Sequence, residues 1–367
     1  MQRERVFNFG AGPGTLPLAV LQQAQRELVA LPGVGASPLE VSHRGTWFRD
    51  VIDRAEEDLR ALLDVPPSHH VVFCQGGATM QFSMVALNVV AEGTPDFVVT
   101  GSWGTKAVAE AERLGGAHVA WTGEGDGFRR VPSSKELAEA LSADASYAHV
   151  TTNETIQGVA FAHTPVVPDG LRLVADASSD FLSRPVDVSR YAVLYAGAQK
   201  NAGPAGVTIA IVADDVVKDV PDDLPTMLDY RTYVEHGSLY NTPPVFAIYV
   251  VGLVARWLRD DVGGLDAMLE RNRAKASLLY DVLDGAPAFF RGHAEPGSRS
   301  LMNVTFRLPS DELEERFVDE AAAGGMTELK GHRSVGGIRA SIYNAMPVEG
   351  VRALAAFMRE FRDRYAD

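Results

Sequence analysis

Two amphipathic helices are predicted near the start of the chain from the spacing of apolar residues. The first follows Pro17 and has apolar side chains from Leu21 to Leu31 at steps of three or four residues. The second covers 47–63, where apolar residues recur at the same spacing while Arg, Asp and Glu occupy the opposite face. Each pattern predicts a helix that packs one face against a hydrophobic core.

Seven short, nearly continuous apolar runs follow. They have the length and the β-branched content of strands buried on both faces, and predicted helices such as Met80–Val90 and Thr105–Leu114 separate several of them. Arg184–Tyr191 is too short for a full crossover helix, which predicts a partly mixed sheet. The pattern predicts an α/β fold with a mostly parallel seven-stranded sheet covered by helices. The runs are Val71–Cys74, Phe97–Thr100, His118–Trp121, Tyr147–Thr151, Leu171–Ala175, Ala192–Ala196 and Val207–Val212.

A proline-rich stretch at 221–244 and a long apolar helix to about Leu258 mark a boundary region. Beyond it, helices are predicted near 265–283, 312–323 and 348–365, and strands near 303–307 and 339–343. We therefore expect a large domain covering 16–258 and a smaller α+β domain made of 1–15 and 259–367.

The composition excludes several classes of protein. With 46% hydrophobic and 22% charged residues the chain can bury a large core, and its net charge of −14 argues against nucleic acid or an anionic membrane as a partner. The apolar stretch Val245–Leu258 is too short for a membrane helix, and no metal-ligand motif is present. Cys74 has no cysteine to pair with, and the N-terminus lacks an apolar signal core, so a cytoplasmic location is expected.

Asp176 and Lys200 follow two of the predicted strands, at the sheet edge where ligands of α/β proteins bind. An enclosed lysine can be kept partly neutral and attack a carbonyl carbon, while a carboxylate can hold a pyridine nitrogen protonated. Together the two residues suggest pyridoxal phosphate as cofactor. Taken singly, Lys200 is more often a solvated loop residue, and Asp176 is as often a capping or turn residue.

Two further features lie at the same sheet edge. Gly76-Gly77 precedes the Met80 helix, and such a turn offers backbone amides to a phosphate, although glycine turns join many strands and helices. Trp103 follows the next strand and is placed to stack on a flat ring, with a partly buried core residue as the alternative.

Basic residues form two pairs, His43-Arg44 and His332-Arg333, with Arg339 on the strand that follows the second pair. In an acidic chain, such groups within glycine-bounded loops suit the binding of carboxylate and phosphate. Taken singly, each is more often a surface ion-pair partner.

Six motifs, spread over the whole chain, resemble those of the phosphoserine aminotransferases, a family of fold type I pyridoxal phosphate enzymes. Any one can occur by chance, but six in order are specific to this family. They are Phe7-Asn-Phe-Gly-Ala-Gly-Pro-Gly, Glu40-Val-Ser-His-Arg-Gly, Asn153-Glu-Thr-Ile-Gln-Gly, Tyr195-Ala-Gly-Ala-Gln-Lys-Asn-Ala-Gly-Pro-Ala-Gly, Tyr240-Asn-Thr-Pro-Pro and Lys330-Gly-His-Arg-Ser-Val-Gly-Gly-Ile-Arg-Ala-Ser-Ile-Tyr-Asn-Ala.

The resemblance implies a role for each matching residue. Lys200 is the Schiff-base lysine and proton carrier, Asp176 the pyridinium partner and Trp103 the stacking residue. Further cofactor contacts are implied for Thr155, Ala78, Thr79 and Gln199, and, from the other subunit of a homodimer, for Asn241 and Thr242. Arg339 is implied to anchor the substrate α-carboxylate. The residues implied to bind the distal phosphate or the side-chain carboxylate of glutamate are His43, Arg44, His332 and Arg333. Some members carry arginine at the position of Thr79, so one phosphate contact must be supplied otherwise.

The implied reaction moves the amino group of L-glutamate to 3-phosphohydroxypyruvate, giving O-phospho-L-serine and 2-oxoglutarate. A related substrate, 4-phosphohydroxythreonine of pyridoxine biosynthesis, stays open. One alternative is another class V aminotransferase or a desulfurase of the same fold, although Cys74, at the end of a buried strand, is poorly placed for desulfurase chemistry. The other is a pyridoxal phosphate-binding regulator or carrier without catalysis.

Overall fold

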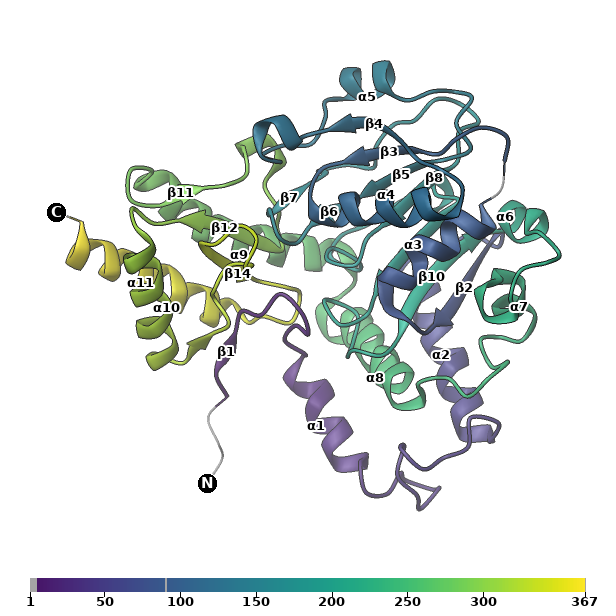
Figure 1. The fold of residues 1–367 in the computed structure, drawn as a ribbon. Coiled ribbons are helices and arrows are strands. Elements are labelled where there is room, and N and C mark those ends of the chain that lie inside the picture. The colour runs from purple at the N-terminus through teal and green to yellow at the C-terminus, as the bar shows by residue number, and fades with distance from the viewer. Residues whose placement is uncertain (1–4, 90, 367) are drawn as a thin grey trace.

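A seven-stranded sheet forms the centre of the larger part of the molecule in the computed structural model, which describes residues 5–89 and 91–366 (Figure 1). The strand order is β2-β10-β9-β8-β5-β3-β4. All seven predicted strands are confirmed in this sheet. They are β2 (His69–Cys74), β3 (Asp96–Val99), β4 (His118–Thr122), β5 (Ala148–Thr151), β8 (Leu173–Asp176), β9 (Val193–Gly197) and β10 (Thr208–Ala213).

The sheet is mixed, but for a different reason from the one the sequence suggested. β8 and β9 are parallel although only a 3-10 turn (Val188–Arg190) lies between them, so the chain returns across the sheet without a full helix. β10 is the strand that runs antiparallel to both of its neighbours, β9 and β2. The reversal from β9 to β10 forms the loop that carries Lys200.

One strand departs from the expectation of burial on both faces. β4 is an edge strand of the sheet, and its residues are exposed or only half-buried. The apolar run His118–Trp121 therefore predicted the strand correctly but not its surroundings, because periodicity does not distinguish a central strand from an edge strand.

Helices cover both faces of the sheet (Figure 1). α2 (Thr46–Leu63) and α8 (Val245–Arg256) pack into the core on one face, and α3 (Gly77–Asn88) and α4 (Ser102–Leu114) into the core on the other. Alternate residues of the central strands enter the two cores, as Phe73 and Cys74 of β2 do. α8 continues into a π-helical turn at Trp257–Val262.

Two helix boundaries differ from the predicted ones. α1 (Leu18–Glu27) ends before Leu28 and Leu31, and Leu31 is buried in the loop that follows. α3 begins at Gly77 instead of Met80, while Val90, the last residue of that predicted helix, lies outside the described residues. The remaining short elements here are α5 (Ser134–Ala140), α6 (Asp214–Asp219), α7 (Tyr230–Glu235), β6 (Asn153–Glu154), β7 (Val159–Ala160) and 3-10 turns at Glu124–Asp126 and Thr226–Leu228.

A smaller part, green to yellow in Figure 1, has its own core, in which aromatic residues such as Phe306 and Phe317 pack edge to face. Its helices and strands lie near the predicted positions. They are α9 (Leu265–Gly285), α10 (Asp311–Ala323), α11 (Val348–Tyr365), an antiparallel sheet of β11 (Arg291–Gly292), β12 (Asn303–Arg307) and β14 (Ile338–Ser341), a 3-10 turn at Pro296–Ser298, and β13 (Met326–Thr327).

The N-terminal segment packs against this smaller part. β1 (Phe7–Asn8) pairs in parallel with β13, and Phe9 lies in the smaller part's core. The division of the chain into 16–258 and 1–15 with 259–367 stays a prediction, and residues 1–4 and 367 lie outside the described residues. The core under α2 and α8 extends as far as Met268.

None of the helices in the described part of the chain is long and apolar enough to cross a membrane.

Candidate active site

A cavity of about 310 Å³ lies at the carboxyl ends of β8 and β9, between the sheet and the smaller part. Nine of the residues predicted for the site line it, and they come from seven separate segments of the chain. They are Ala78, Thr79, Trp103, Thr155, Asp176, Gln199, Lys200, His332 and Arg339.

Five predicted residues do not line this cavity. His43 and Arg44 lie in the loop before α2, and Asn241 and Thr242 in the loop before α8. The Thr242 backbone oxygen accepts a hydrogen bond from Gln75 Nε2 at 3.1 Å, beside the Gly76-Gly77 turn. Arg333 lines a separate groove along α10. Within one chain, the cavity therefore contains one member of one of the two His-Arg pairs.

Lys200 projects into the cavity from the loop between β9 and β10. Its Nζ donates a hydrogen bond to Thr155 Oγ1 at 2.5 Å and lies 5.2 Å from the centre of the Trp103 ring. Burial lowers the pKa of Lys200 to about 8, because removal from water disfavours the ammonium, and the nearby carboxylates of Asp176 and Glu154 only partly offset this. About a tenth of the amine is therefore neutral at pH 7 and able to act as a nucleophile, far more than for an ordinary lysine.

The backbone around Lys200 depends on close packing by the N-terminal segment. Gly14 N–H donates to the Gln199 backbone oxygen at 2.7 Å. A Cβ at Gly14 would lie 2.7 Å from the Lys200 oxygen and 2.8 Å from Tyr343 Cδ2, so only glycine allows this approach. The glycine-rich N-terminal motif thus forms one wall of the cavity.

Asp176 is the last residue of β8, and its carboxylate is buried. Asp176 Oδ1 accepts the Ser178 N–H at 2.9 Å, and Ser178 Oγ in turn accepts the Gly197 N–H at 3.0 Å. Burial raises the pKa of Asp176, although these hydrogen bonds and Lys200 oppose the shift. A buried carboxylate held in this way is suited to pair with a protonated ring nitrogen.

The Gly76-Gly77 turn leads directly into α3. Both glycines have positive φ, 86° and 69°, and a Cβ at Gly76 would lie 2.6 Å from Met80 Cβ. The turn therefore requires glycine, and it presents the first-turn amides of α3, at Ala78 and Thr79, to the cavity. The N-terminus of a helix in this position is an anion site.

Two buried nitrogen donors at the site have no hydrogen-bond partner among the described residues: Arg339 Nε and Trp103 Nε1. Burial also lowers the pKa of the Arg339 guanidinium. A partly desolvated cation with a free donor favours the binding of an anion.

The sequence did not reveal four features of the site. The buried carboxylate of Glu154 accepts a hydrogen bond from the start of α4, and the Ser178 N–H donates to Asp176. Ala11 and Gly12 line the cavity from the N-terminal segment. Glu154, Ala11 and Gly12 stand within the motifs that carried the resemblance. Their contacts join residues distant in the sequence, so the motifs alone did not show them. Lys106 Nζ, in addition, lies 4.0 Å from the Trp103 ring centre.

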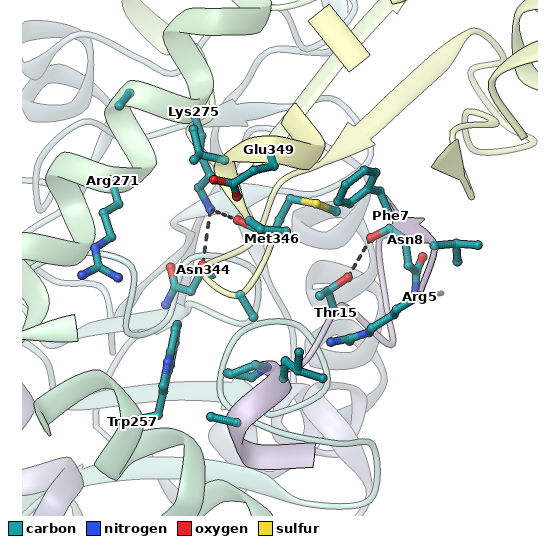
Figure 2. Close-up of a pocket in the computed structure, with 18 residues that line it drawn as sticks. Arg5, Phe7, Asn8, Thr15, Trp257, Arg271, Lys275, Asn344, Met346 and Glu349 are labelled. Carbon is teal, nitrogen blue, oxygen red and sulfur yellow. Dashed lines mark hydrogen bonds between the residues drawn. The ribbon is translucent and has the colours of Figure 1, made fainter. Parts of the chain in front are cut away.

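Figure 2 shows a larger cavity, of about 770 Å³, where the N-terminal segment meets α9 and residues 344–349. Lys275 of α9 is buried beside it and donates from Nζ to the backbone oxygens of Tyr343 at 2.7 Å and Ile342 at 2.9 Å. These bonds hold the loop that follows β14, the strand carrying Arg339. No predicted site residue lines this second cavity.

Comparison with known proteins decides the family. The model of the class V aminotransferase family matches residues 6–354. The phosphoserine aminotransferase of Rhodopirellula baltica is 51% identical over 363 residues, which cover 98% of this chain and 96% of that protein. The chain belongs to the phosphoserine aminotransferases, within class V. This confirms the family that the six motifs indicated, and with it the expectation of an aminotransferase.

Solved structures agree with this assignment. The phosphoserine aminotransferase of Bacillus circulans subsp. alkalophilus superposes with a TM-score of 0.95 at 48% identity, covering 98% of this chain and 99% of that one. The pyridoxal phosphate-bound phosphoserine aminotransferase of Trichomonas vaginalis gives a TM-score of 0.90 at 38% identity, covering 97% and 100%. The predicted fold class, that of fold type I enzymes, is confirmed.

Proposed function

We propose that the protein uses pyridoxal phosphate to transfer the amino group of L-glutamate to 3-phosphohydroxypyruvate, forming O-phospho-L-serine and 2-oxoglutarate in serine biosynthesis. The observation that carries the proposal is one cavity that combines Lys200, buried Asp176 and the unpaired guanidinium of Arg339. The 51% identity with a phosphoserine aminotransferase over nearly the whole chain supports the choice of substrate.

The residues present fit pyridoxal phosphate. The amides at Ala78 and Thr79 suit its phosphate, Asp176 suits its ring nitrogen, and Trp103 provides a flat surface for its ring. Lys200 is placed to hold its carbonyl carbon covalently. When bound, the cofactor supplies an electron-accepting ring that stabilises the electron pair left at the substrate Cα.

The chain's own groups would then share the work as follows. Lys200 Nζ takes the proton from the Cα of the amino donor in the first half-reaction and delivers a proton to the Cα of the acceptor in the second. Thr155, 2.5 Å from Lys200 Nζ, orients the amine. Arg339 pairs with the α-carboxylate common to all four substrates, and His332 faces the distal anion.

We include a homodimer, because four of the five residues that do not line the cavity follow exposed apolar side chains in the sequence. Val29 is 85% exposed and Leu39 65% exposed in the segment that leads to His43, and Tyr240, 49% exposed, precedes Asn241. Exposed apolar groups of this kind mark interaction surfaces. We infer that a second copy covers them and brings His43, Arg44, Asn241 and Thr242 to the partner's cavity.

We also propose a cytoplasmic location and a second substrate. A cytoplasmic location is supported by the unpaired thiol of Cys74, which is typical of a reducing compartment. Use of 4-phosphohydroxythreonine in pyridoxine biosynthesis is supported by its chemistry. Like phosphoserine, it carries an amino group and a carboxylate at one end and a phosphate at the other.

A coupled assay with 2-oxoglutarate as acceptor tests the function. We expect turnover of O-phospho-L-serine and of 4-phosphohydroxythreonine, and little turnover of L-serine. Equal use of serine would favour a general class V aminotransferase, and a protein that binds pyridoxal phosphate without turnover would be a regulator or carrier instead.

A further inference from the structure

Glu154 is a completely buried carboxylate beside the candidate active site, with an exposed fraction of 0%. It lies at the end of β6. Its two oxygens accept hydrogen bonds from consecutive backbone amides at the start of α4: Oε2 from Trp103 N–H at 3.0 Å and Oε1 from Gly104 N–H at 2.8 Å. The carboxylate therefore acts as a cap for α4 from a residue 51 positions away in the sequence.

Glycines make room for this contact. A Cβ at Gly101 would lie 2.6 Å from Glu154 Cδ, and one at Gly104 would lie 3.4 Å from Glu154 Oε1. The backbone at Gly101 is extended, so the requirement for glycine there comes from space and not from conformation. The Gly-Ser-Trp-Gly sequence is thus fitted closely around the carboxylate.

Two residues of the turn that follows β6 make further contacts. Thr155 accepts a hydrogen bond from Lys200 Nζ. Gln157 Oε1 accepts the Ser102 N–H at 3.3 Å, while Gln157 Nε2 donates to Ser102 Oγ at 2.8 Å. The β6–β7 turn consequently binds three successive amides of α4 and the amine of Lys200 at once.

The protonation of the Glu154 carboxyl depends on a balance between burial and its hydrogen-bond partners. Burial raises its pKa to about 7, although the two amides and Lys200 favour the ionised form. The N-terminus of α4 adds a favourable partial charge. Replacing Glu154 by glutamine would lose one of the two hydrogen bonds, because the side-chain NH₂ group of glutamine would face a backbone N–H, and both groups are donors.

We propose that Glu154 is a positioning residue, which fixes Trp103 relative to Lys200 so that the indole ring is held in place to stack on the cofactor ring. This rests on the proposed binding of pyridoxal phosphate. Glu154 itself does not line the cavity and acts through the backbone of Trp103.

The test measures cofactor binding separately from turnover. Apoprotein carrying Glu154→Gln is titrated with pyridoxal phosphate, the visible circular dichroism of the bound cofactor is recorded, and urea unfolding of the apoprotein is followed. We expect Kd to rise about tenfold, as typical for a lost hydrogen bond to a charged group, and the dichroism band to change. Glu154→Asp, which keeps the charge but shortens the side chain, serves the same purpose if Glu154→Gln does not fold.

Gln157→Leu is the matched control, because it removes a contact with the same end of α4 without touching the Trp103 amide. It should lower the stability to urea but leave Kd and the dichroism band near wild type. If Gln157→Leu raises Kd as much as Glu154→Gln does, Glu154 is a structural cap only, and the proposal is wrong.

Trp103→Ala completes a double-mutant cycle, because it removes the ring and keeps the backbone amide that Glu154 binds. If Glu154 acts through the indole, Glu154→Gln should change Kd less than about twofold in the Trp103→Ala background. If the two substitutions instead change Kd independently, so that their fold-changes multiply, the positioning role is wrong. If Trp103→Ala alone leaves Kd unchanged, the stacking role of Trp103 fails and the inference fails with it, whereas turnover of phosphoserine by the wild type still supports the proposed function.

Discussion

Lys200 links burial to reactivity at the scale of a single residue. Its pKa is lowered to about 8 from an ordinary 10.5, so the neutral amine predominates above pH 8. The rate at which the apoprotein binds pyridoxal phosphate covalently should rise about tenfold per pH unit below pH 8, in proportion to the neutral amine, and then level off. Stopped-flow absorbance measures this rate, with Lys200→Ala as the control that forms no covalent product. A rate that keeps rising to pH 10 would show an ordinary lysine.

Asp176 gives the second prediction at this scale. Asp176→Asn should leave the fold intact but slow the single-turnover reaction, because a neutral amide cannot stabilise a protonated ring nitrogen. We expect the activation free energy to rise by about 2–4 kcal/mol. Asp180→Asn is a control of the same type, since Asp180 accepts from Thr152 Oγ1 and does not line the cavity. It should affect stability more than rate, and a near-normal rate for Asp176→Asn with cofactor bound would exclude the assigned role.

The sequence could indicate Lys200 and Asp176 because both follow buried strands, and strand ends at one sheet edge meet in space. Glu154 and Ser178 could not be found in the same way. Glu154 accepts a hydrogen bond from an amide 51 positions away. Ser178 donates its N–H to Asp176 and accepts the Gly197 N–H, which joins the ends of two strands. Such roles depend on the packed backbone and leave no pattern of their own.

At the scale of elements, the turn before α3 depends on glycine for two reasons. Gly76 has a positive φ, and its Cβ position is also blocked by Met80, whereas Gly170 has a φ of 82° with nothing within 4 Å. Gly170→Ala should cost about 1 kcal/mol of unfolding free energy and Gly76→Ala more than about 2 kcal/mol. Urea denaturation measures both, and Gly76→Ala should also weaken cofactor binding. Equal costs would mean that Met80 moves aside freely.

Strand positions were predicted well because buried strands are short continuous apolar runs, but strand direction was not. The return from β8 to β9 occurs without a full helix, so the length of Arg184–Tyr191 gave a misleading indication. Helix starts were less well placed. α4 begins at Ser102, where caps from Glu154 and Gln157 reach it, and no residue near Ser102 in the sequence shows this.

For the whole molecule, we predict a dimer that brings His43 and Asn241 to the partner's cavity. Val29→Asp combined with Leu39→Asp should yield monomers by sedimentation and reduce activity, because charges in an apolar interface are costly. Val166→Asp, at a residue 62% exposed in another segment, is the control and should stay dimeric. A monomeric wild type with full activity would show that one chain suffices.

The cavity is suited to a substrate with a carboxylate at one end and a phosphate at the other. The ratio of kcat/KM for O-phospho-L-serine to that for L-serine, with 2-oxoglutarate as acceptor, measures this preference. We expect a ratio of at least about 10³ in the wild type, because serine leaves basic groups of the pocket unpaired. Arg339→Ala should lower both values alike, and His332→Ala should lower the ratio. A wild-type ratio near one, or a ratio unchanged by His332→Ala, would show that the cavity does not select the phosphate.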